Sequence, residues 1–465
     1  MLFSLQDIFD SFELYKENSL SDTITKYRDI IPLLGYHRKR KTIKIKQLGK
    51  SVNGKVIYGV TVGTGEINVL AWSQMHGDES TATRTFFDFL NFITQPSYAS
   101  FCEWLFSKIT LHYIPMLNPD GAEIANRFNA LGIDINRDAV DLVSPEAEIL
   151  DRVFREINPD FSLNLHDQDG WYGAGTENKP TAISFLATVM KSRKELSEAR
   201  KKAMSVIGKT AKALCEVIPG HIAKYNDEYE PRAFGDNFAC KNSSVILIEA
   251  GRWKDDDNKE YIRKVFFSAF VTILNYIAEG KHPASAQKIY RNLPENKETF
   301  LDLIIRNVKL RDKYIVDIGI KRKPVYVQNE KRIIYEGKIE AIGDLSTYYG
   351  FEEYDLNGYS AISGNYHPFE FTETDEIIIN HLSLFRKGVT TIILNKKIDT
   401  EKLSEYSFNF GMDMKTINNE IFPGNFANFY LRNNEDTIDF IVVNGFFINL
   451  AKDDFNIPNA IIGIN

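Results

Sequence analysis

Cysteine is scarce in this chain. Only three occur in 465 residues, and they lie far apart, at Cys102, Cys215 and Cys240. Their number and spacing exclude a disulfide framework and a thiolate metal site. A secretory signal is also missing, because Asp7 and Asp10 place negative charge where such a signal would be apolar. We therefore expect a cytoplasmic protein, unless an export signal has been removed from this sequence.

Positive charge is not in excess, and long apolar runs are absent. Lys and Arg number 56 against 63 Asp and Glu, a net charge of −7, which argues against a basic surface for nucleic acid. The one basic cluster, residues 37–46, alternates in its second half like an edge strand with solvated lysines. No apolar run approaches the ~18 residues of a membrane span. We expect neither nucleic acid nor a membrane as partner, and the sequence leaves the oligomeric state open.

The chain does contain an alternation of strand-like and helix-like segments. Strand-like apolar stretches occur at residues 42–48, 56–63, 67–73, 109–116, 161–167 and 244–251. Several lack a polar alternation, which indicates strands covered on both faces. Helical patterns lie between and after them, at 80–94, 144–157, 192–217 and 258–279. This order predicts an α/β fold, a three-layer sandwich with a mixed, mostly parallel sheet.

The composition changes near residue 281. Prolines and charges gather in residues 281–297, which we interpret as a linker. Residues 1–280 before it form the predicted α/β domain. Short strand-like runs prevail in residues 298–465, so a smaller, mostly β accessory domain is expected there.

A candidate metal site begins at His76 and Glu79, a His-x-x-Glu pattern directly after an apolar run. This spacing alone is weak evidence, since it recurs at His367 and Glu370. Hydrolytic zinc takes about three protein ligands and leaves one position for water. His166, at the end of another predicted strand, is a candidate third ligand. His367 has no comparable partners in the sequence and is interpreted as structural.

Further polar residues occur in the same region. Glu249 follows four aliphatic residues, where a carboxylate is costly unless it is paired or functional. A salt bridge with Arg252 is the structural alternative. Arg127, Asn136 and Arg137 lie in a polar loop able to bind a carboxylate through paired hydrogen bonds. The same loop could equally be a turn-rich surface segment.

Five motifs stand in a fixed order in the chain. They are His-Gly-Asp-Glu (76–79), Asn-Pro-Asp-Gly (118–121), an arginine before Gly-x-Asp-x-Asn-Arg (127–137), the strand-end His166 and Leu-Ile-Glu-Ala-Gly (247–251). This ordered set, over residues 40–280, resembles the zinc carboxypeptidase family, the funnel-like metallocarboxypeptidases. The resemblance implies one Zn²⁺ per chain, held by His76, Glu79 and His166.

The resemblance also implies roles for five other residues. Asp134 corresponds to the acid that orients a ligand imidazole, and Glu249 to the general base. Arg127 corresponds to the residue that stabilises the oxyanion. Asn136 and Arg137 correspond to the pair that binds the terminal carboxylate of the substrate.

Two positions of the family pattern are ambiguous. The tyrosine that caps the substrate could be Tyr225 or Tyr229, and Tyr229 is the one predicted here. Phe234 lies where the specificity residue would be sought. The preferred substrate side chain is therefore not predicted.

These motifs predict a zinc-dependent hydrolase that releases a C-terminal residue from a peptide or peptide-like substrate. The alternative is a zinc-dependent amidohydrolase of N-acyl amino acids, similar to aspartoacylase and succinylglutamate desuccinylase. The Asn-Pro-Asp-Gly and Leu-Ile-Glu-Ala-Gly motifs favour the peptidase. A non-catalytic binding module is disfavoured, because no ligand or base position is substituted.

The C-terminal part has a resemblance of its own. Residues 300–367 resemble the composite β-sandwich that flanks the barrel of cyclic amidohydrolases. The paired-histidine motif usual after such a sandwich is missing. We interpret this part as an accessory module without a metal centre of its own.

Overall fold

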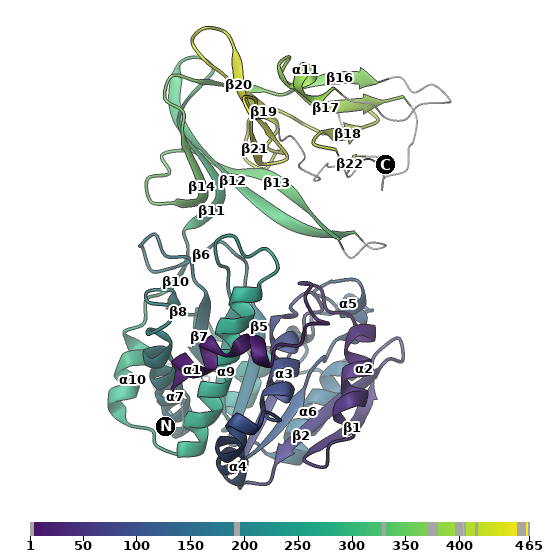
Figure 1. Ribbon diagram of the computed structural model, residues 1–465, viewed down its shortest axis with the longest axis vertical. Coiled ribbons are helices and arrows are strands. Elements are labelled where there is room, and N and C mark those ends of the chain that lie inside the picture. The colour runs from purple at the N-terminus through teal and green to yellow at the C-terminus, as the bar shows by residue number, and fades with distance from the viewer. Residues whose placement is uncertain are drawn as a thin grey trace. The chain divides into compact units, whose positions relative to one another are not determined.

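The computed structural model describes residues 4–189, 196–327, 332–369, 380–395, 403, 406–413, 417–452 and 462–463. Two compact units divide the chain, Met1–Glu298 and Thr299–Asn465 (Figure 1). The first is an α/β unit that carries the candidate site. The second is mostly β, as the sequence predicts.

An eight-stranded sheet forms the centre of the N-terminal unit (Figure 1), in the order β1-β2-β4-β3-β5-β9-β7-β8. Its strands are β1 (Ile43–Lys50), β2 (Val56–Gly63), β3 (Ile67–Trp72), β4 (Ile109–Ile114), β5 (Phe161–Asp167), β7 (Ile183–Ala187), β8 (Ile222–Lys224) and β9 (Ser244–Ala250). The run β4-β3-β5-β9 is parallel, while β1, β2 and β7 bring antiparallel pairs. The predicted mixed, mostly parallel sheet is confirmed.

Helices cover both faces of this sheet. They are α1 (Leu5–Asp10), α2 (Tyr27–His37), α3 (Thr81–Phe92), α4 (Ala99–Lys108), α5 (Pro119–Glu123), α6 (Pro145–Ile157), α7 (Glu198–Leu214), α8 (Phe234–Cys240), α9 (Glu260–Glu279) and α10 (Ala284–Arg291). Short 3-10 turns lie at Phe12–Leu14, Pro96–Tyr98 and Ile135–Arg137.

Two hydrophobic cores show why the layers number three. Side chains alternate across a strand, so Val69 and Ala71 of β3 pack with residues of α3, α7 and α9. Their neighbours Leu70 and Trp72 pack on the opposite face with residues of α6 and α8. The sheet is therefore the middle layer between two helical layers, and the predicted three-layer sandwich is confirmed.

Local sequence signals set the limits of α6. The hydroxyl of Ser144 accepts a hydrogen bond from the backbone N–H of Ala147, and Pro145 occupies the first helical position. Asn158 ends the helix in the left-handed region, at φ 48°. Asparagine adopts that conformation more readily than most residues. The prediction of a helix over residues 144–157 rested on the same cap.

The segment predicted as a linker, residues 281–297, contains ordered elements. It forms α10 and the short strand β10 (Asn296–Glu298), both inside the N-terminal unit. Pro283 stands at the N-cap of α10, where proline does not interrupt a helix. Ala286 and Tyr290 are buried on the face toward α7. Gly208 of α7 approaches this helix so closely that a Cβ there would lie 1.9 Å from the carbonyl oxygen of Ala286.

Helix α9 is the central helix of the larger core. By length and composition alone this helix of 20 residues could cross a membrane, since it contains an apolar window of 18 residues. That window is 89% buried inside the protein. Among the described residues, no other helix passes this test of length and composition.

The C-terminal unit contains two sheets and one described helix, α11 (His381–Phe385). The larger sheet contains β11 (Phe300–Leu310), β12 (Tyr314–Val327), β13 (Arg332–Gly343), β14 (Tyr349–Asp355), β15 (Ser360–Ser363), β19 (Phe429–Arg432), β20 (Ile438–Val443) and β21 (Phe446–Asn449). The smaller contains β16 (Asn365–Phe369), β17 (Val389–Leu394), β18 (Asn409–Gly411) and β22 (Ile462–Gly463). His367 lies in β16, whereas Glu370 falls outside the described residues.

Candidate metal and catalytic site

Three neighbouring strands bring the candidate ligands and the candidate base together. His76 and Glu79 lie between the end of β3 and the start of α3, and His166 lies near the end of β5. Since β3, β5 and β9 run parallel, their carboxyl ends meet at one edge of the sheet. Glu249 is the direct register partner of His166 across β5 and β9. The two side chains therefore stand next to each other on the same face.

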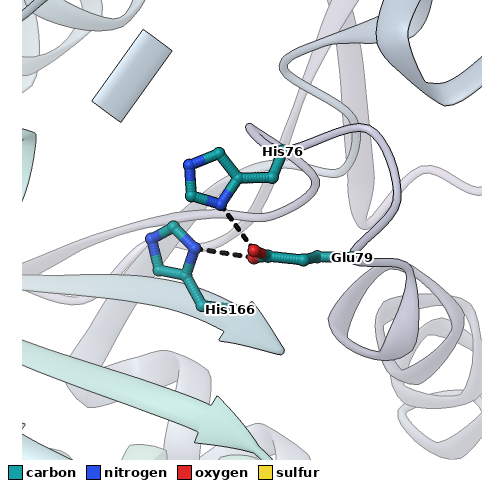
Figure 2. Close-up of side chains that lie close together, drawn as sticks. All are labelled: His76, Glu79 and His166. Atoms are coloured by element: carbon teal, nitrogen blue, oxygen red, sulfur yellow. Dashed lines mark hydrogen bonds and ion pairs between the residues drawn. The ribbon is translucent and has the colours of Figure 1, made fainter. Parts of the chain in front are cut away.

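Both candidate imidazoles turn the same nitrogen toward one carboxylate (Figure 2). His76 Nδ1 lies 2.6 Å from Glu79 Oε1, and His166 Nδ1 lies 2.7 Å from Glu79 Oε2. One donor atom from each residue lies within 4.8 Å of the other two. Both histidines are buried. Among the described residues, no second cluster of three such groups is found.

The electrostatics of this trio are dominated by Glu79. Burial alone would lower the pKa of His76, but the charge of Glu79 and the hydrogen bonds to Asp134 and Glu79 raise it to about 9. Burial lowers the pKa of His166 despite the nearby carboxylate. Burial would raise the pKa of Glu79, but the two histidines hold it well below its usual range. An anionic carboxylate with a neutral His166 is a suitable arrangement for a cation.

Asp134 holds the outer side of His76. Its Oδ1 lies 3.2 Å from His76 Nε2, the nitrogen that faces away from Glu79. Its Oδ2 accepts from Nε and Nη2 of Arg127 at 3.1 and 3.0 Å. The third nitrogen of that guanidinium, Nη1, lies 3.2 Å from His76 Nδ1 and 3.6 Å from Glu79 Oε1. Asp134 thus fixes the ring of His76 and the guanidinium of Arg127 at once.

The donor set fits a zinc ion. Two imidazole nitrogens and one carboxylate are the ligands of many hydrolytic zinc sites, in which the remaining position is left for water. A carboxylate on the far nitrogen of a ligand histidine is the usual outer support of such a site. The buried Nε2 of His166 has no hydrogen-bond partner among the described residues. Asp134 therefore supports only one of the two rings.

The Asn-Pro-Asp-Gly motif (118–121) contacts the turn that carries His76 and holds it in place. The side chain of Asn118 accepts from the backbone N–H of Gly121 and donates to the carbonyl oxygens of Met75 and Arg127. Gly77 packs so tightly on Gly121 that a Cβ there would lie 2.1 Å from its carbonyl carbon. The motif therefore fixes the chain on both sides of His76 and also fixes Arg127.

Glu249 lies deeply buried beside His166. Burial is the main cause that raises its pKa well above the ordinary value, and the negative charge of Glu79 adds to it. Arg252 was the alternative partner for Glu249 in a salt bridge. Its side chain packs close to Gly170, where a Cβ would lie 2.5 Å from Arg252 Cδ. Glu249 is thus a buried carboxyl group with a raised pKa next to the candidate metal site.

Asn136 and Arg137 lie on the turn that follows Asp134. The backbone N–H of Phe234 donates to Asn136 Oδ1 at 3.1 Å, which ties this turn to the start of α8. Arg137 is half exposed and donates to the carbonyl oxygen of Asn136 at 2.8 Å. Its Nε lies 3.6 Å from Glu230 Oε2. A carboxylate of the chain therefore already stands beside the arginine predicted to bind one.

The two candidate tyrosines have different surroundings. The hydroxyl of Tyr229 lies 3.7 Å from Cys240 Sγ of α8, and that contact is the main cause that raises its pKa to about 12. For Tyr225, the negative charge of Glu249 is the largest cause that raises the pKa, ahead of burial. The charge of Glu249 thus acts on Tyr225, whereas the hydroxyl of the predicted Tyr229 contacts Cys240.

Asp167 was not identified from the sequence, and its contacts hold the end of β5 next to His166. Asp167 follows His166, and its Oδ2 accepts from Thr81 Oγ1 at 2.6 Å and from Lys259 Nζ at 3.0 Å. Its backbone N–H donates to Glu79 Oε2 at 3.2 Å. These contacts join β5 to the start of α3 and to the turn before α9. Position next to a candidate ligand is the one signal in the sequence that points to Asp167.

Comparisons with known proteins agree with this geometry. The family model of the zinc carboxypeptidases matches residues 37–191. That range includes His76, Glu79, Asp134 and His166, while Glu249 lies beyond it. Over 184 residues the chain is 28% identical to carboxypeptidase SOL1 of Arabidopsis thaliana, and the match covers 36% of each chain. The chain thus spans about a third of the length of this curated relative.

Two solved structures align with part of this chain. A metallo-carboxypeptidase from Burkholderia cenocepacia aligns with a TM-score of 0.45 and 16% identity, over 55% of this chain and 70% of that one. Carboxypeptidase A from Helicoverpa armigera aligns with a TM-score of 0.45 and 15% identity, over 60% of this chain and 80% of that one.

Proposed function

We propose that this chain, a zinc carboxypeptidase-family hydrolase in its N-terminal unit, removes the C-terminal residue of a peptide or peptide-like substrate. One observation carries the proposal. Nδ1 atoms of His76 and His166 converge on the two oxygens of Glu79, and Glu249 stands directly beside His166. This is the arrangement that hydrolysis at a single metal ion requires.

Zinc bound by His76, Glu79 and His166 would polarise the scissile carbonyl and lower the pKa of water. Glu249 would accept the proton of the attacking water and deliver it to the leaving amine. Its burial supports this role, because a raised pKa brings a carboxyl group closer to working pH. Asp134 would keep His76 in one orientation and one tautomer.

Arg127 would stabilise the negative charge that develops on the carbonyl oxygen. Nη1 of this residue lies 3.2 Å from His76 Nδ1, and Asp134 restrains the other two nitrogens of the guanidinium. A donor restrained before the reaction needs little reorganisation when the charge develops. This favours Arg127 over Arg137 for the role.

Three residues would bind the end of the substrate. Arg137 and Asn136 offer donors to the terminal carboxylate, and the planar guanidinium suits its two oxygens. Glu230, beside Arg137, would give up that contact when a substrate carboxylate arrives. Tyr225, whose pKa is raised most by the negative charge of Glu249, would close over the bound residue.

A substrate screen tests the proposal. Purified chain with equimolar zinc is offered matched peptides with a free or an amidated C-terminus, and a set of N-acyl amino acids. We expect release of single C-terminal residues from the free peptides only. Hydrolysis of N-acyl amino acids without peptide cleavage would instead support the amidohydrolase. Cleavage within the amidated peptides would contradict an action at the C-terminus.

A further inference from the structure

The stretch at the end of the N-terminal unit, Pro294–Glu298, contacts one segment that follows His166 in the chain and another that precedes Tyr225. Strand β10 pairs antiparallel with β6 (Tyr172–Ala174), the short strand that follows His166 along the chain (Figure 1). The register joins Asn296 to Ala174 and Glu298 to Tyr172. The backbone N–H of Gly175 also donates to the carbonyl oxygen of Glu295 at 2.9 Å.

A second set of contacts joins this stretch to β8. The backbone N–H of Lys224 donates to the carbonyl oxygen of Pro294 at 2.7 Å, and Lys224 Nζ lies 2.7 Å from Glu295 Oε1. Tyr225 is the next residue, and its backbone N–H donates to the carbonyl oxygen of Phe185 in β7. Phe185 and Ser184 of β7 oppose Ile248 and Glu249 of β9. The backbone of Tyr225 is therefore fixed between the departing stretch and the strand that borders Glu249.

Side-chain hydrogen bonds connect the same stretch to β7, the strand that pairs with β9 at Glu249. Asn296 Nδ2 donates to Gln168 Oε1 at 2.8 Å, and that oxygen also accepts from Ser184 Oγ at 2.9 Å. Gln168 lies two residues after His166, and its backbone N–H donates to the carbonyl oxygen of Ala250. Its amide is buried, and Nε2 has no partner among the described residues. One side-chain oxygen thus joins Asn296 to the strand opposite Glu249.

We propose that Asn296 is a positioning residue, which together with Pro294–Glu298 holds Tyr225 and the loop of residues 168–175 in place over the substrate. The proposal rests on the proposed function, because it takes Tyr225 as a residue that contacts substrate. It explains why the connection to the C-terminal unit begins as a strand within the catalytic unit. It also adds a determinant of substrate engagement that lies outside the ligands and the base.

The variant Asn296→Ala tests this inference. It removes the side-chain bond to Gln168 and leaves the backbone pairing of β10 intact. We expect KM for a free-acid peptide to rise about two- to tenfold, the equivalent of one lost neutral hydrogen bond, with kcat and zinc content unchanged. Amide exchange should become faster in peptides covering residues 172–176 and 222–226. Exchange in residues 73–80, around His76 and Glu79, should stay as in the wild type.

A conservative variant and a matched control sharpen the test. Asn296→Asp should keep KM close to the wild-type value, because Gln168 can reverse its amide and donate Nε2 to the new carboxylate. Asn292→Ala changes an exposed asparagine just after α10 and should behave as the wild type. Asn296→Leu keeps the approximate volume but cannot donate to Gln168, so it should behave like Asn296→Ala; a wild-type KM in Asn296→Leu would show that Asn296 only fills space.

Two results would overturn the inference. Unchanged KM together with unchanged exchange in Asn296→Ala would show that the bond to Gln168 positions nothing. A parallel fall in kcat, zinc content and thermal stability would show that Asn296 supports the fold in general. If the wild type cleaves no peptide, the proposed function fails by itself. The exchange pattern of Asn296→Ala then still decides whether this stretch holds residues 172–176 and 222–226.

Discussion

At the scale of single residues, the site contains three carboxylates in two electrostatic states. Two histidines keep Glu79 ionised, and His76 with Arg127 do the same for Asp134. The main influence on the pKa of Glu249 is burial, which raises it, and not the charge of a nearby cation. Carboxyl groups whose surroundings push their pKa values apart are suited to different tasks, as binding groups or as an acid and base.

The variant Glu249→Gln separates the proposed base from the metal site. Glutamine keeps the shape but cannot accept a proton, so kcat should fall about 10²- to 10⁴-fold while zinc content stays at one per chain. Steady-state kinetics and elemental analysis provide the two measurements. Glu156→Gln, at an exposed position of α6, is the matched control and should leave kcat unchanged. Near-normal turnover of Glu249→Gln would remove it from the mechanism.

The variant Arg137→Ala tests the proposed carboxylate site. Wild type should prefer a free-acid peptide to its amide by as much as ~10⁴-fold, because the amide leaves the donors unmatched. Arg137→Ala should be slow on both and lose most of this preference. Arg137→Lys should recover little, since an ammonium group lacks the planar fork. A retained preference in Arg137→Ala would assign carboxylate binding to another residue, and Arg291→Ala on α10 is the control.

At the scale of elements, two buried arginines fasten the N-terminal segment to the catalytic fold. Arg263 of α9 pairs with Asp88 of α3 at 2.5 Å, and both side chains are fully buried. Arg263 also donates to the carbonyl oxygens of Leu20 and Glu17. Arg84 of α3 donates to the carbonyl oxygen of Leu20 as well. The carbonyls of this segment are thereby satisfied inside the protein, as buried backbone groups must be.

The same segment reaches the metal-binding turn. Gln74, in the left-handed region at φ 49°, donates from Nε2 to the carbonyl oxygens of Thr25 and Gly77. Ser80 donates to the carbonyl oxygen of Thr23. The turn that carries His76 and Glu79 is thus held at both ends by residues before the family match begins at 37.

The variant Arg263→Met should lower the free energy of unfolding by about 3–5 kcal/mol. Removing one partner of a buried pair leaves the charge of Asp88 uncompensated, which costs more than the pair itself contributes. Chemical denaturation followed by circular dichroism measures the change. Arg291→Met, at the exposed end of α10, should shift it by no more than about 0.5 kcal/mol. An effect of Arg263→Met as small as that control would mean that water or a local rearrangement satisfies Asp88.

At the scale of the whole molecule, the two units should respond differently to zinc. Candidate ligands for a metal cluster occur only in the N-terminal unit among the described residues. A ligand that binds the folded state stabilises it by about 2.7 kcal/mol when its concentration is 100 times Kd. Zinc should therefore stabilise one unit and leave the other unaffected.

Chelation of zinc should lower the melting temperature of the unfolding transition that belongs to the N-terminal unit. Calorimetry with and without chelator measures the shift, and excess zinc should reverse it. In the double variant His76→Ala/His166→Ala, the melting temperature of the N-terminal unit should be the same with and without chelator. If the melting temperature of the wild type is the same with and without chelator, these residues do not form a zinc site.

The amino-acid sequence by itself determined the class of fold and the three candidate metal ligands. Apolar runs without alternation mark strands buried on both faces, and β5 and β9 prove to be such strands. His76 and Glu79 stand three residues apart on one turn, so their convergence is a local matter. A helix cap such as Ser144 also involves residues only a few positions apart, so the sequence predicts it for the same reason.

Tertiary structure alone decided which distant residues meet. Tyr225 and Tyr229 lie four residues apart in an irregular stretch, and no periodicity distinguishes them. The pairing of β8 with β7 brings Tyr225 toward Glu249, whereas Tyr229 faces Cys240. Likewise, prolines and charges in residues 281–297 are typical of a linker. Only packing against α7 and pairing with β6 make this segment part of the N-terminal unit, because those contacts join residues far apart in the chain.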